Sequence, residues 1–403
     1  MTLFRHKVAV AGHVCLDIIP TFNLKKLNSN NWLIPGTLNE VGPAIISTGG
    51  AVANTGIALR TLGVDVKLMG KIGDDLFGTT TLNYFNQIED NFGKYMTVAS
   101  GESSSYTIVL SSEHLDRVFL HCSGTNDTFT IDDIDFSQLE DVDIFHFGYP
   151  PLMYQMYTNE GLMLSNVFKK AKQMDVITSL DMAMPDSDSK SGQVDWKIIL
   201  RHTLPYVDIF LPSIEEILMM LRPAKYKEFQ SKAGSDDILS YINGDLLTSL
   251  ADDLLQKGAK TIVFKLGEHG LYLRTTSEAE MVWTNIFPPV IRKKWINREV
   301  IIPSFKVKVA GTTGAGDCTI AGFLASITHH LSPEEALNYA IGAGSNNVQK
   351  ADATSGMVSW NTLNKQIKTD LVHRNVFQPL IKNWEKSNKR NTWLGPNDNH
   401  TNN

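Results

Sequence analysis

The stretch that decides the fold is Lys306-Val307-Lys308-Val309-Ala310-Gly311-Thr312-Thr313-Gly314-Ala315-Gly316-Asp317. Residues 306–309 alternate polar and apolar side chains, which predicts a strand, and apolar residues recur at helical spacing from Cys318 onward. Three glycines and two threonines lie between these two elements. The stretch therefore predicts a strand, a tight glycine turn and a helix that begins near Asp317.

A glycine turn before a helix is suited to binding an anion. The first N–H groups of a helix have no partner within the helix, and they carry the positive end of its dipole. Glycines let the backbone come close to a phosphate. An aspartate here would repel phosphate, but it could take the proton of a hydroxyl group that attacks phosphorus. The alternative is that Asp317 only caps the helix and the glycines only form a turn.

The segment from Gly311 to Asp317 resembles the C-terminal signature of the ribokinase-like (phosphofructokinase-B type) carbohydrate kinases. The resemblance implies that Asp317 is the catalytic base and that ATP and Mg²⁺ are cofactors. It also implies an anion hole formed by the backbone of Thr313, Gly314, Ala315 and Gly316. The family usually has Asp where this chain has Gly311, so a requirement for a monovalent cation stays open.

A second match to this family is Ser47-Thr48-Gly49-Gly50-Ala51-Val52-Ala53-Asn54. Two glycines open a helix of small residues, and the resemblance implies that Gly49, Gly50 and Asn54 contact the sugar. An asparagine supplies both a donor and an acceptor, which suits a hydroxyl group. Asp17 follows the apolar first strand and matches the family residue that binds sugar hydroxyls. The alternatives are a tightly packed helix start for the glycines and a turn residue for Asp17.

Three further positions resemble the nucleotide and metal side of the family's site. Ser213 and Glu216 stand where the family has Asn-x-x-Glu, which implies contact with the nucleotide for Ser213 and with Mg²⁺ through water for Glu216. An acid in the first turn of a helix explains Glu216 equally well. Lys265 and Gly267 lie in a segment like the one that flanks the nucleotide, although Lys265 could instead be exposed.

Strands and helices alternate from residue 143 onward, which predicts a parallel sheet with helices on both faces. The resemblance implies a ribokinase-like three-layer α/β/α sandwich with a mostly parallel central sheet and a small β-sheet lid. We expect the kinase domain to cover 1–372, with the lid from about 18–47 and 98–125. Residues 373–403 are expected to form a docked helix and a polar, disordered tail, and the inserts 225–245 and 281–302 are expected on the surface.

Composition limits the partners. The chain has 403 residues, of which 42% are hydrophobic and 20% charged, and its net charge is −6. These values favour neither a nucleic acid nor a membrane as partner. The three cysteines are widely spaced, so neither a disulfide framework nor a zinc site is indicated. We expect a cytoplasmic protein whose partners are ATP and a small sugar, and a possible homodimer formed through the lid.

The resemblance implies ATP-dependent phosphorylation of a hydroxyl group, usually a primary one, on a small carbohydrate. Two alternatives stay open at this stage. One is a nucleoside kinase of the same fold. The other is a non-catalytic sugar-binding regulator on the same scaffold. Three departures from the family keep it open: Gly311 replaces an Asp, Ser213 replaces an Asn, and the Asp-x-Asn-x-Arg pattern of many members retains only Asp181 here.

Overall fold

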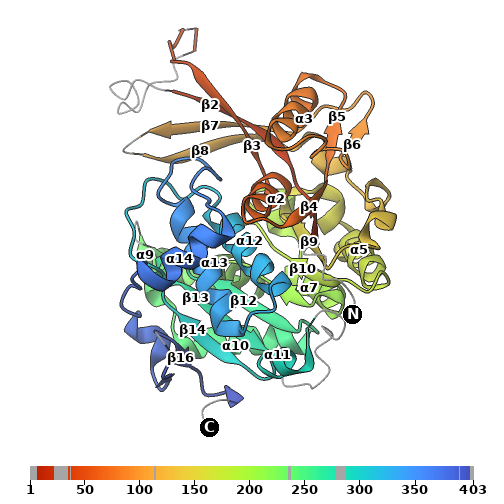
Figure 1. The fold of residues 1–403 in the computed structure, drawn as a ribbon. Helices are drawn as coiled ribbons and strands as arrows, with labels where there is room; N and C mark the ends of the chain where they lie inside the picture. The colour runs from red at the N-terminus through yellow and green to blue at the C-terminus, as the bar shows by residue number, and fades with distance from the viewer. Residues whose placement is uncertain are drawn as a thin grey trace.

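The structure is a computed structural model that describes residues 7–21, 35–36, 38–112, 115–234, 237–276, 287–389 and 391–399. Within these residues a ten-stranded sheet forms the centre of the body (Figure 1). Its strands, in spatial order, are β15 (Glu385–Lys386), β16 (Trp393–Leu394), β14 (Glu299–Ile302), β13 (Leu271–Thr275), β12 (Thr261–Lys265), β11 (Ile209–Phe210), β10 (Ile177–Leu180), β9 (Ile144–Gly148), β1 (Lys7–Gly12) and β4 (Asp65–Met69). The strands from β12 to β4 are parallel, and the remaining strands join antiparallel.

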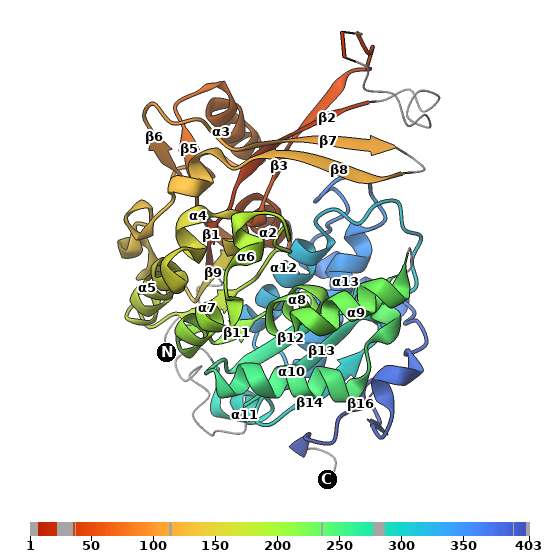
Figure 2. The ribbon, with the colours of Figure 1, turned by 180° about the vertical axis from the view of Figure 1, so that it is seen from behind.

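The parallel strands are almost wholly apolar because helices cover both faces of the sheet. In β9, Phe145 and Phe147 enter the hydrophobic core on one face, and Ile144 enters the core on the other. The first face carries α5 (Leu162–Lys172), α7 (Trp196–Thr203), α8 (Ile214–Leu221) and α10 (Gly244–Gln256), seen in front in Figure 2. The second face carries α2 (Ala51–Thr61), α12 (Ala315–Thr328), α13 (Pro333–Asn347) and α14 (Trp360–Thr369). The expected three-layer sandwich is confirmed.

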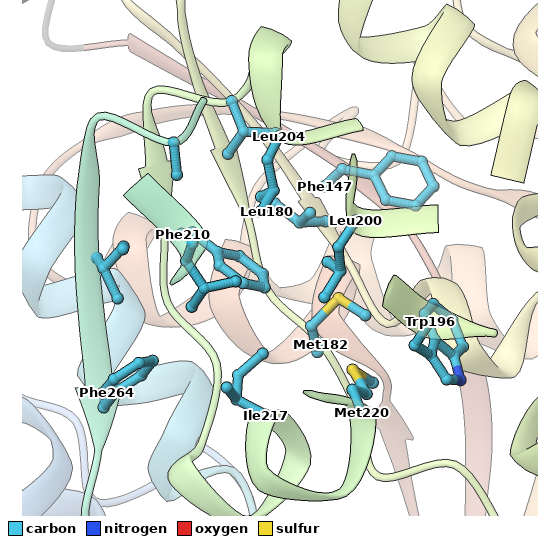
Figure 3. Packing of buried hydrophobic residues seen from close by; sticks show 14 of the residues in the cluster. Phe147, Leu180, Met182, Trp196, Leu200, Leu204, Phe210, Ile217, Met220 and Phe264 are labelled. Carbon is cyan, nitrogen blue, oxygen red and sulfur yellow. The ribbon is translucent and has the colours of Figure 1, made fainter. Parts of the chain in front are cut away.

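Figure 3 shows how the first of these cores is packed. Phe147, Leu180 and Phe210 come from three adjacent strands and lie in one cluster with Leu200 and Met220 of the covering helices. All five side chains are buried. This packing fixes the carboxyl ends of the strands, on which the site described below is built.

A second sheet stands over the carboxyl ends of the parallel strands (Figure 1, top). Its strands, in spatial order, are β3 (Ala44–Gly49), β2 (Cys15–Pro20), β7 (Tyr106–Ser112) and β8 (Leu115–Cys122). This sheet is the expected lid, and its first strand begins at Cys15, earlier than the expected residue 18. Residues 22–34 of the expected lid, and 281–286 of the expected insert, lie outside the described residues.

The chain enters the lid at Gly12 and leaves it at Gly50, and both glycines have positive φ angles of 118° and 86°. A Cβ atom on Gly12 would lie 2.4 Å from the carbonyl oxygen of Gly148. A side chain at either position would therefore disturb the junction between lid and body.

The approach to the glycine turn differs from the expectation. Residues 306–309 do not form a strand, and the strand that precedes them, β14, ends at Ile302. The segment instead follows other backbone, with Lys306 N donating to Val372 O and Ala310 N donating to Val348 O. The helix α12 begins at Ala315, with Gly314 as its N-cap.

The insert 225–245 is more regular than a surface loop. It contains most of α9 (Pro223–Ala233), with a proline at the start of the helix, and the 3₁₀ turn Ile238–Tyr241. Phe229 and Ala233 are buried, so the helix has an apolar side despite its polar composition.

The C-terminal segment contradicts the expected helix and disordered tail. Residues Gln378–Ile381 form only a 3₁₀ turn, and β15 and β16 join the edge of the central sheet. Asp398 is buried and accepts a hydrogen bond from Arg298 Nε at 2.9 Å. A buried guanidinium needs acidic partners, so polar residues that suggest a loose tail are used here to pair buried charges. Residues 400–403 lie outside the described residues.

Cys15, Cys122 and Cys318 are all free thiols. In the described part of the chain, no helix combines the length and the apolar character needed to cross a bilayer.

Candidate active site

Polar residues follow neighbouring parallel strands at the edge of the sheet beneath the lid. His13 follows β1, Tyr149 follows β9, Asp181 follows β10, Ser213 lies beyond β11, and Lys265 ends β12. Ligand sites in parallel α/β sheets lie outside these carboxyl ends. The topology therefore collects these side chains in one place.

Asp317 lies in the first turn of α12 and is only 2% exposed. Its Oδ2 accepts a hydrogen bond from Asn54 Nδ2 at 2.9 Å, and Thr55 Oγ1 lies 3.4 Å from Oδ1. The Tyr149 hydroxyl lies 2.8 Å from both carboxylate oxygens. Burial raises the pKa of Asp317 above its ordinary value, although these hydrogen bonds oppose the shift. A carboxylate with a raised pKa is a stronger base.

The glycine turn before Asp317 has the geometry of an anion cradle. Gly314 is left-handed, with φ 69°, and a Cβ atom on it would lie 2.2 Å from the carbonyl oxygen of Ala353. The N–H of Ala315 donates to Thr312 O at 3.2 Å, so this expected donor is used within the turn. Gly316 and Asp317 follow in the first turn, where N–H groups have no acceptor within the helix.

A cavity of about 260 Å³ opens beside this turn. Most of its wall is apolar or glycine, including Gly267, Phe305, Val307, Gly316, Ile341 and Val348. Lys265 also lines the cavity, and Arg374 reaches it from the C-terminal segment. An apolar cavity that ends at a helix N-terminus suits a ligand with a flat ring at one end and an anion at the other.

Lys265 is mostly buried, which excludes the exposed interpretation. Its Nζ lies 2.6 Å from Asp181 Oδ1. Burial by itself lowers the pKa of Lys265, but the nearby carboxylates of Asp181, Glu216 and Asp317 outweigh that effect and raise it. Lys265 is therefore a cation held between the cradle and the acids around it.

Ser213 and Glu216 form a capping box at the start of α8. Glu216 Oε2 accepts from Ser213 N at 2.7 Å, and Ser213 Oγ accepts from Glu216 N at 3.2 Å. This supports the interpretation of Glu216 as an acid in the first turn of a helix. Glu216 also raises the pKa of Lys265, so its charge lies near the site. No group of three or more His, Cys, Asp or Glu residues in the described ranges could hold a metal ion.

The lid presents a polar row toward the body. Cross-strand pairing aligns Ser47, Asp17, Thr107 and His121 across its strands. Burial raises the pKa of Asp17, and a Cβ atom on Gly49 would lie 2.5 Å from Asp17 Oδ2. Gly49 therefore leaves room for this carboxylate.

Two histidines connect the lid to the body at this row. His13 Nε2 lies 3.4 Å from His121 Nε2, and His121 Nδ1 lies 3.0 Å from Thr107 Oγ1. His13 Nδ1 and Asn54 Oδ1 are buried without a hydrogen-bond partner. Buried polar atoms without partners are costly, and they mark a place where a ligand with hydroxyl groups would fit.

The structure brings together Asp17, Gly49, Gly50, Asn54 and Asp317 on one side of α12, and Lys265, Gly267 and the cradle on the other. Tyr149, His13 and His121 were not among the site residues expected from the sequence. One signal was present for the first two, because Tyr149 and His13 directly follow strands that end in glycine.

The sequence is similar to known proteins over most of its length. A family model described as pfkB family carbohydrate kinase matches residues 5–360. A protein of Archaeoglobus fulgidus described as an uncharacterized sugar kinase is 26% identical over 256 residues, which are 64% of this chain and 80% of that protein.

Two solved structures share the fold at low sequence identity. A fructokinase with bound ATP from Xylella fastidiosa is 15% identical and has a TM-score of 0.66, with 90% of this chain and 98% of that chain covered. A ribokinase of Arabidopsis thaliana complexed with ribose and ATP is 18% identical and has a TM-score of 0.65, with 90% and 99% covered. The expected ribokinase-like fold is confirmed.

Proposed function

The chain belongs to the pfkB family of carbohydrate kinases, and from this premise we propose that it transfers the γ-phosphoryl group of ATP to a hydroxyl group, usually primary, of a small sugar. The observation that supports this most directly is the buried carboxylate of Asp317 at the N-terminus of α12. The carboxylate contacts Asn54 of α2, and Ala315 and Gly316 of the same helix turn line the cavity. A base and an anion cradle on one turn are what transfer from a phosphate to a hydroxyl group needs.

In this proposal the sugar lies between the lid and α2. Asp17 accepts hydrogen bonds from sugar hydroxyl groups, and the bare backbone of Gly49 and Gly50 lets the sugar approach. Asn54 keeps its Nδ2 on Asp317, so its unpartnered Oδ1 can accept from the sugar. Asp317 then takes the proton of the attacking hydroxyl group.

The nucleotide occupies the cavity on the other side of α12. Gly267 borders the nucleotide, and the backbone from Thr313 to Gly316 supports the phosphates. Ser213 does not line the cavity but pairs with Lys265, which does. Lys265 contributes positive charge near the transferred group, because its Nζ lies 3.6 Å from where a Cβ atom on Gly316 would be. Mg²⁺ would be held by the phosphates and by Glu216 through water, and it would neutralise charge on the phosphates.

The test is ADP release from Mg-ATP with a panel of sugars and nucleosides, with and without potassium. Asp317→Asn should lower turnover about 10²–10⁴-fold, the usual contribution of a general base. Its melting temperature and its ATP binding should be retained, which shows that the variant is folded. Sugar binding by the wild type without turnover on any substrate would contradict the proposal and favour a non-catalytic regulator.

The folding stability of Asp317→Asn should depend on pH differently from that of the wild type. The raised pKa of Asp317 means that the folded state binds this proton more tightly than the unfolded state does. The contribution of Asp317 to wild-type stability therefore falls as pH rises from below the ordinary carboxyl pKa through the raised pKa. Asn cannot titrate, so its stability relative to wild type should increase over that interval in denaturant titrations at several pH values.

We also propose that two copies pair through their lids. Apolar side chains are exposed on both edge strands, at Ile45 and Ile46 of β3 and at Val118, Phe119 and Leu120 of β8. Charge at this surface should oppose pairing, so Phe119→Asp should reduce the particle mass measured by light scattering to that of a monomer. A monomeric wild type would contradict this part of the proposal.

A further inference from the structure

Tyr149 has an unusual backbone conformation for a bulky residue. Its φ and ψ angles are 65° and 41°, in the left-handed region that non-glycine residues seldom adopt. Gly148 precedes it and Pro150 follows it, and its carbonyl accepts a hydrogen bond from Leu152 N at 3.0 Å. Backbone strain of this kind persists where the surroundings enforce it, and it is concentrated at functional sites.

The strained backbone aims the Tyr149 hydroxyl at the base. The hydroxyl lies 2.8 Å from both Oδ1 and Oδ2 of Asp317. The same carboxylate also contacts Asn54 and Thr55, so its hydrogen-bonding positions are largely used. The phenol is thus bound to the base as an attacking hydroxyl group would be.

We propose that Tyr149 is a gate that occupies Asp317 until a sugar displaces it, and that it thereby prevents the transfer of phosphoryl groups to water. This inference rests on the proposed function, because it assigns Asp317 as the base. Burial raises the pKa of the Tyr149 phenol well above its ordinary value, so the hydroxyl stays neutral and can donate to the carboxylate.

The prevented reaction is ATP hydrolysis. A water oxygen would form a bond to the γ-phosphorus, and the bond from that phosphorus to the β–γ bridging oxygen would break. The water proton would pass to Asp317, and ADP and phosphate would leave. Water is smaller than any sugar and far more abundant, so an exposed base beside the cradle would favour this side reaction.

A sugar can displace the phenol where water cannot. Additional hydroxyl groups of the sugar can bind Asp17 and Asn54, and that binding energy can drive the rearrangement. The Tyr149 ring also lies beside the His13 ring, with a centroid distance of 6.0 Å, and His13 contacts His121 of the lid. Movement of Tyr149 would therefore change the contact between His13 and His121 at the base of the lid.

The test is phosphate release from Mg-ATP by Tyr149→Phe without sugar. Phe keeps the ring and removes only the hydroxyl group. We expect hydrolysis to rise roughly tenfold to a hundredfold, the range that corresponds to losing a hydrogen bond to a charged group. The KM for sugar should fall, because the sugar no longer competes with the phenol. Tyr157→Phe, which alters another buried tyrosine outside this contact, should change neither value.

Two further variants keep the inference falsifiable. The double variant Asp317→Asn with Tyr149→Phe should return hydrolysis to the wild-type level, because the water would be activated by Asp317. Tyr149→Asn should also hydrolyse ATP faster, since Asn tolerates the left-handed backbone and its side chain is shorter than a tyrosine. Tyr149→Asn replaces Tyr149→Phe in the hydrolysis test if the Phe variant folds poorly.

The outcomes separate the gate from other roles. Slower sugar phosphorylation by Tyr149→Phe without faster hydrolysis would overturn the gate and make Tyr149 a positioning residue for Asp317. No change in either reaction would overturn it in favour of a purely structural turn. If the wild type phosphorylates no sugar, yet Tyr149→Phe hydrolyses ATP in a way that depends on Asp317, the gate stands and the proposed sugar kinase fails.

Discussion

The two sides of α12 are lined by different kinds of chemical group. On the side proposed to bind the nucleotide, here the nucleotide-facing side, a cavity of about 260 Å³ is lined mainly by apolar side chains and by glycine backbone. On the side proposed to bind the sugar, here the sugar-facing side, polar side chains lie close together, and Asn54 and His13 each keep a buried polar atom without a partner. The first side can recognise a ligand by shape and backbone N–H groups, and the second by side-chain hydrogen bonds.

This difference predicts different sensitivities. A site made of backbone depends on the chain being able to adopt its path, so the loss of a glycine should be its most damaging change. A site made of polar side chains depends on each partner, and a missing partner leaves another polar group buried and unpaired. The two sides should therefore respond to different kinds of substitution.

Gly314→Ala should have the largest effect on the nucleotide-facing side. The left-handed φ of 69° costs a non-glycine residue about 1–2 kcal/mol, and the new Cβ atom would lie 2.2 Å from the carbonyl oxygen of Ala353. That carbonyl belongs to the backbone, so the turn itself must shift. We expect a lower melting temperature and a large loss of ATP affinity, measured by thermal unfolding and by calorimetry.

Gly316→Ala is the matched control. A Cβ atom there meets nothing closer than Lys265 Nζ at 3.6 Å, and alanine favours a helix more than glycine does by about 1 kcal/mol. The fold should be kept or stabilised, while ATP affinity falls because the new methyl group enters the cavity. Equal losses of stability in the two variants would show that the conformation of Gly314 is not what the cradle depends on.

The sequence predicted those parts of the molecule that local chemistry determines. Gly314 of the cradle and the Gly49–Gly50 pair mark places where a side chain cannot stand, and only one residue type meets that need. The parallel sheet and its two helical layers follow from alternating apolar segments, which have to be buried on both faces. These features needed no knowledge of distant contacts.

The missed features depend on residues that are far apart in the chain. Tyr149 reaches Asp317 only because β9 ends beside the first turn of α12, and a lone tyrosine after a strand does not indicate that contact. Asp398 lies in a polar segment, and its buried position is explained by two distant donors, Arg298 Nε and Glu299 N. The strand expected at 306–309 was wrong because the backbone at its two ends bonds to residues that form no strand: Lys306 N donates to Val372 O, and Ala310 N donates to Val348 O.

The smallest expected effect concerns the histidine pair of the sugar-facing side. Burial lowers the pKa of His13, and the charge of His121 would lower it further; burial also lowers the pKa of His121, against an opposing effect of Asp127. Both rings are therefore neutral near pH 7, and one can donate to the other. A lowered histidine pKa means that the contact is fully present above the ordinary pKa of about 6.5 and is lost as pH falls through the lowered values. The KM for sugar should rise a few-fold over that interval, while the KM for ATP stays level.

His121→Gln isolates this effect, because glutamine keeps a hydrogen-bonding group and does not titrate. Its KM for sugar should be less dependent on pH than that of the wild type, and His202→Gln, at the end of α7, should behave as wild type. Tyr149 also faces His13, so the profile should be repeated in the Tyr149→Phe background to separate the two contacts. If the KM for ATP changed with pH as much as the KM for sugar, the histidines would not belong to the sugar-facing side alone. The proposed division of the site by α12 would then be wrong, because protonation of histidines under the lid would change ATP binding in the cavity on the other side of the helix.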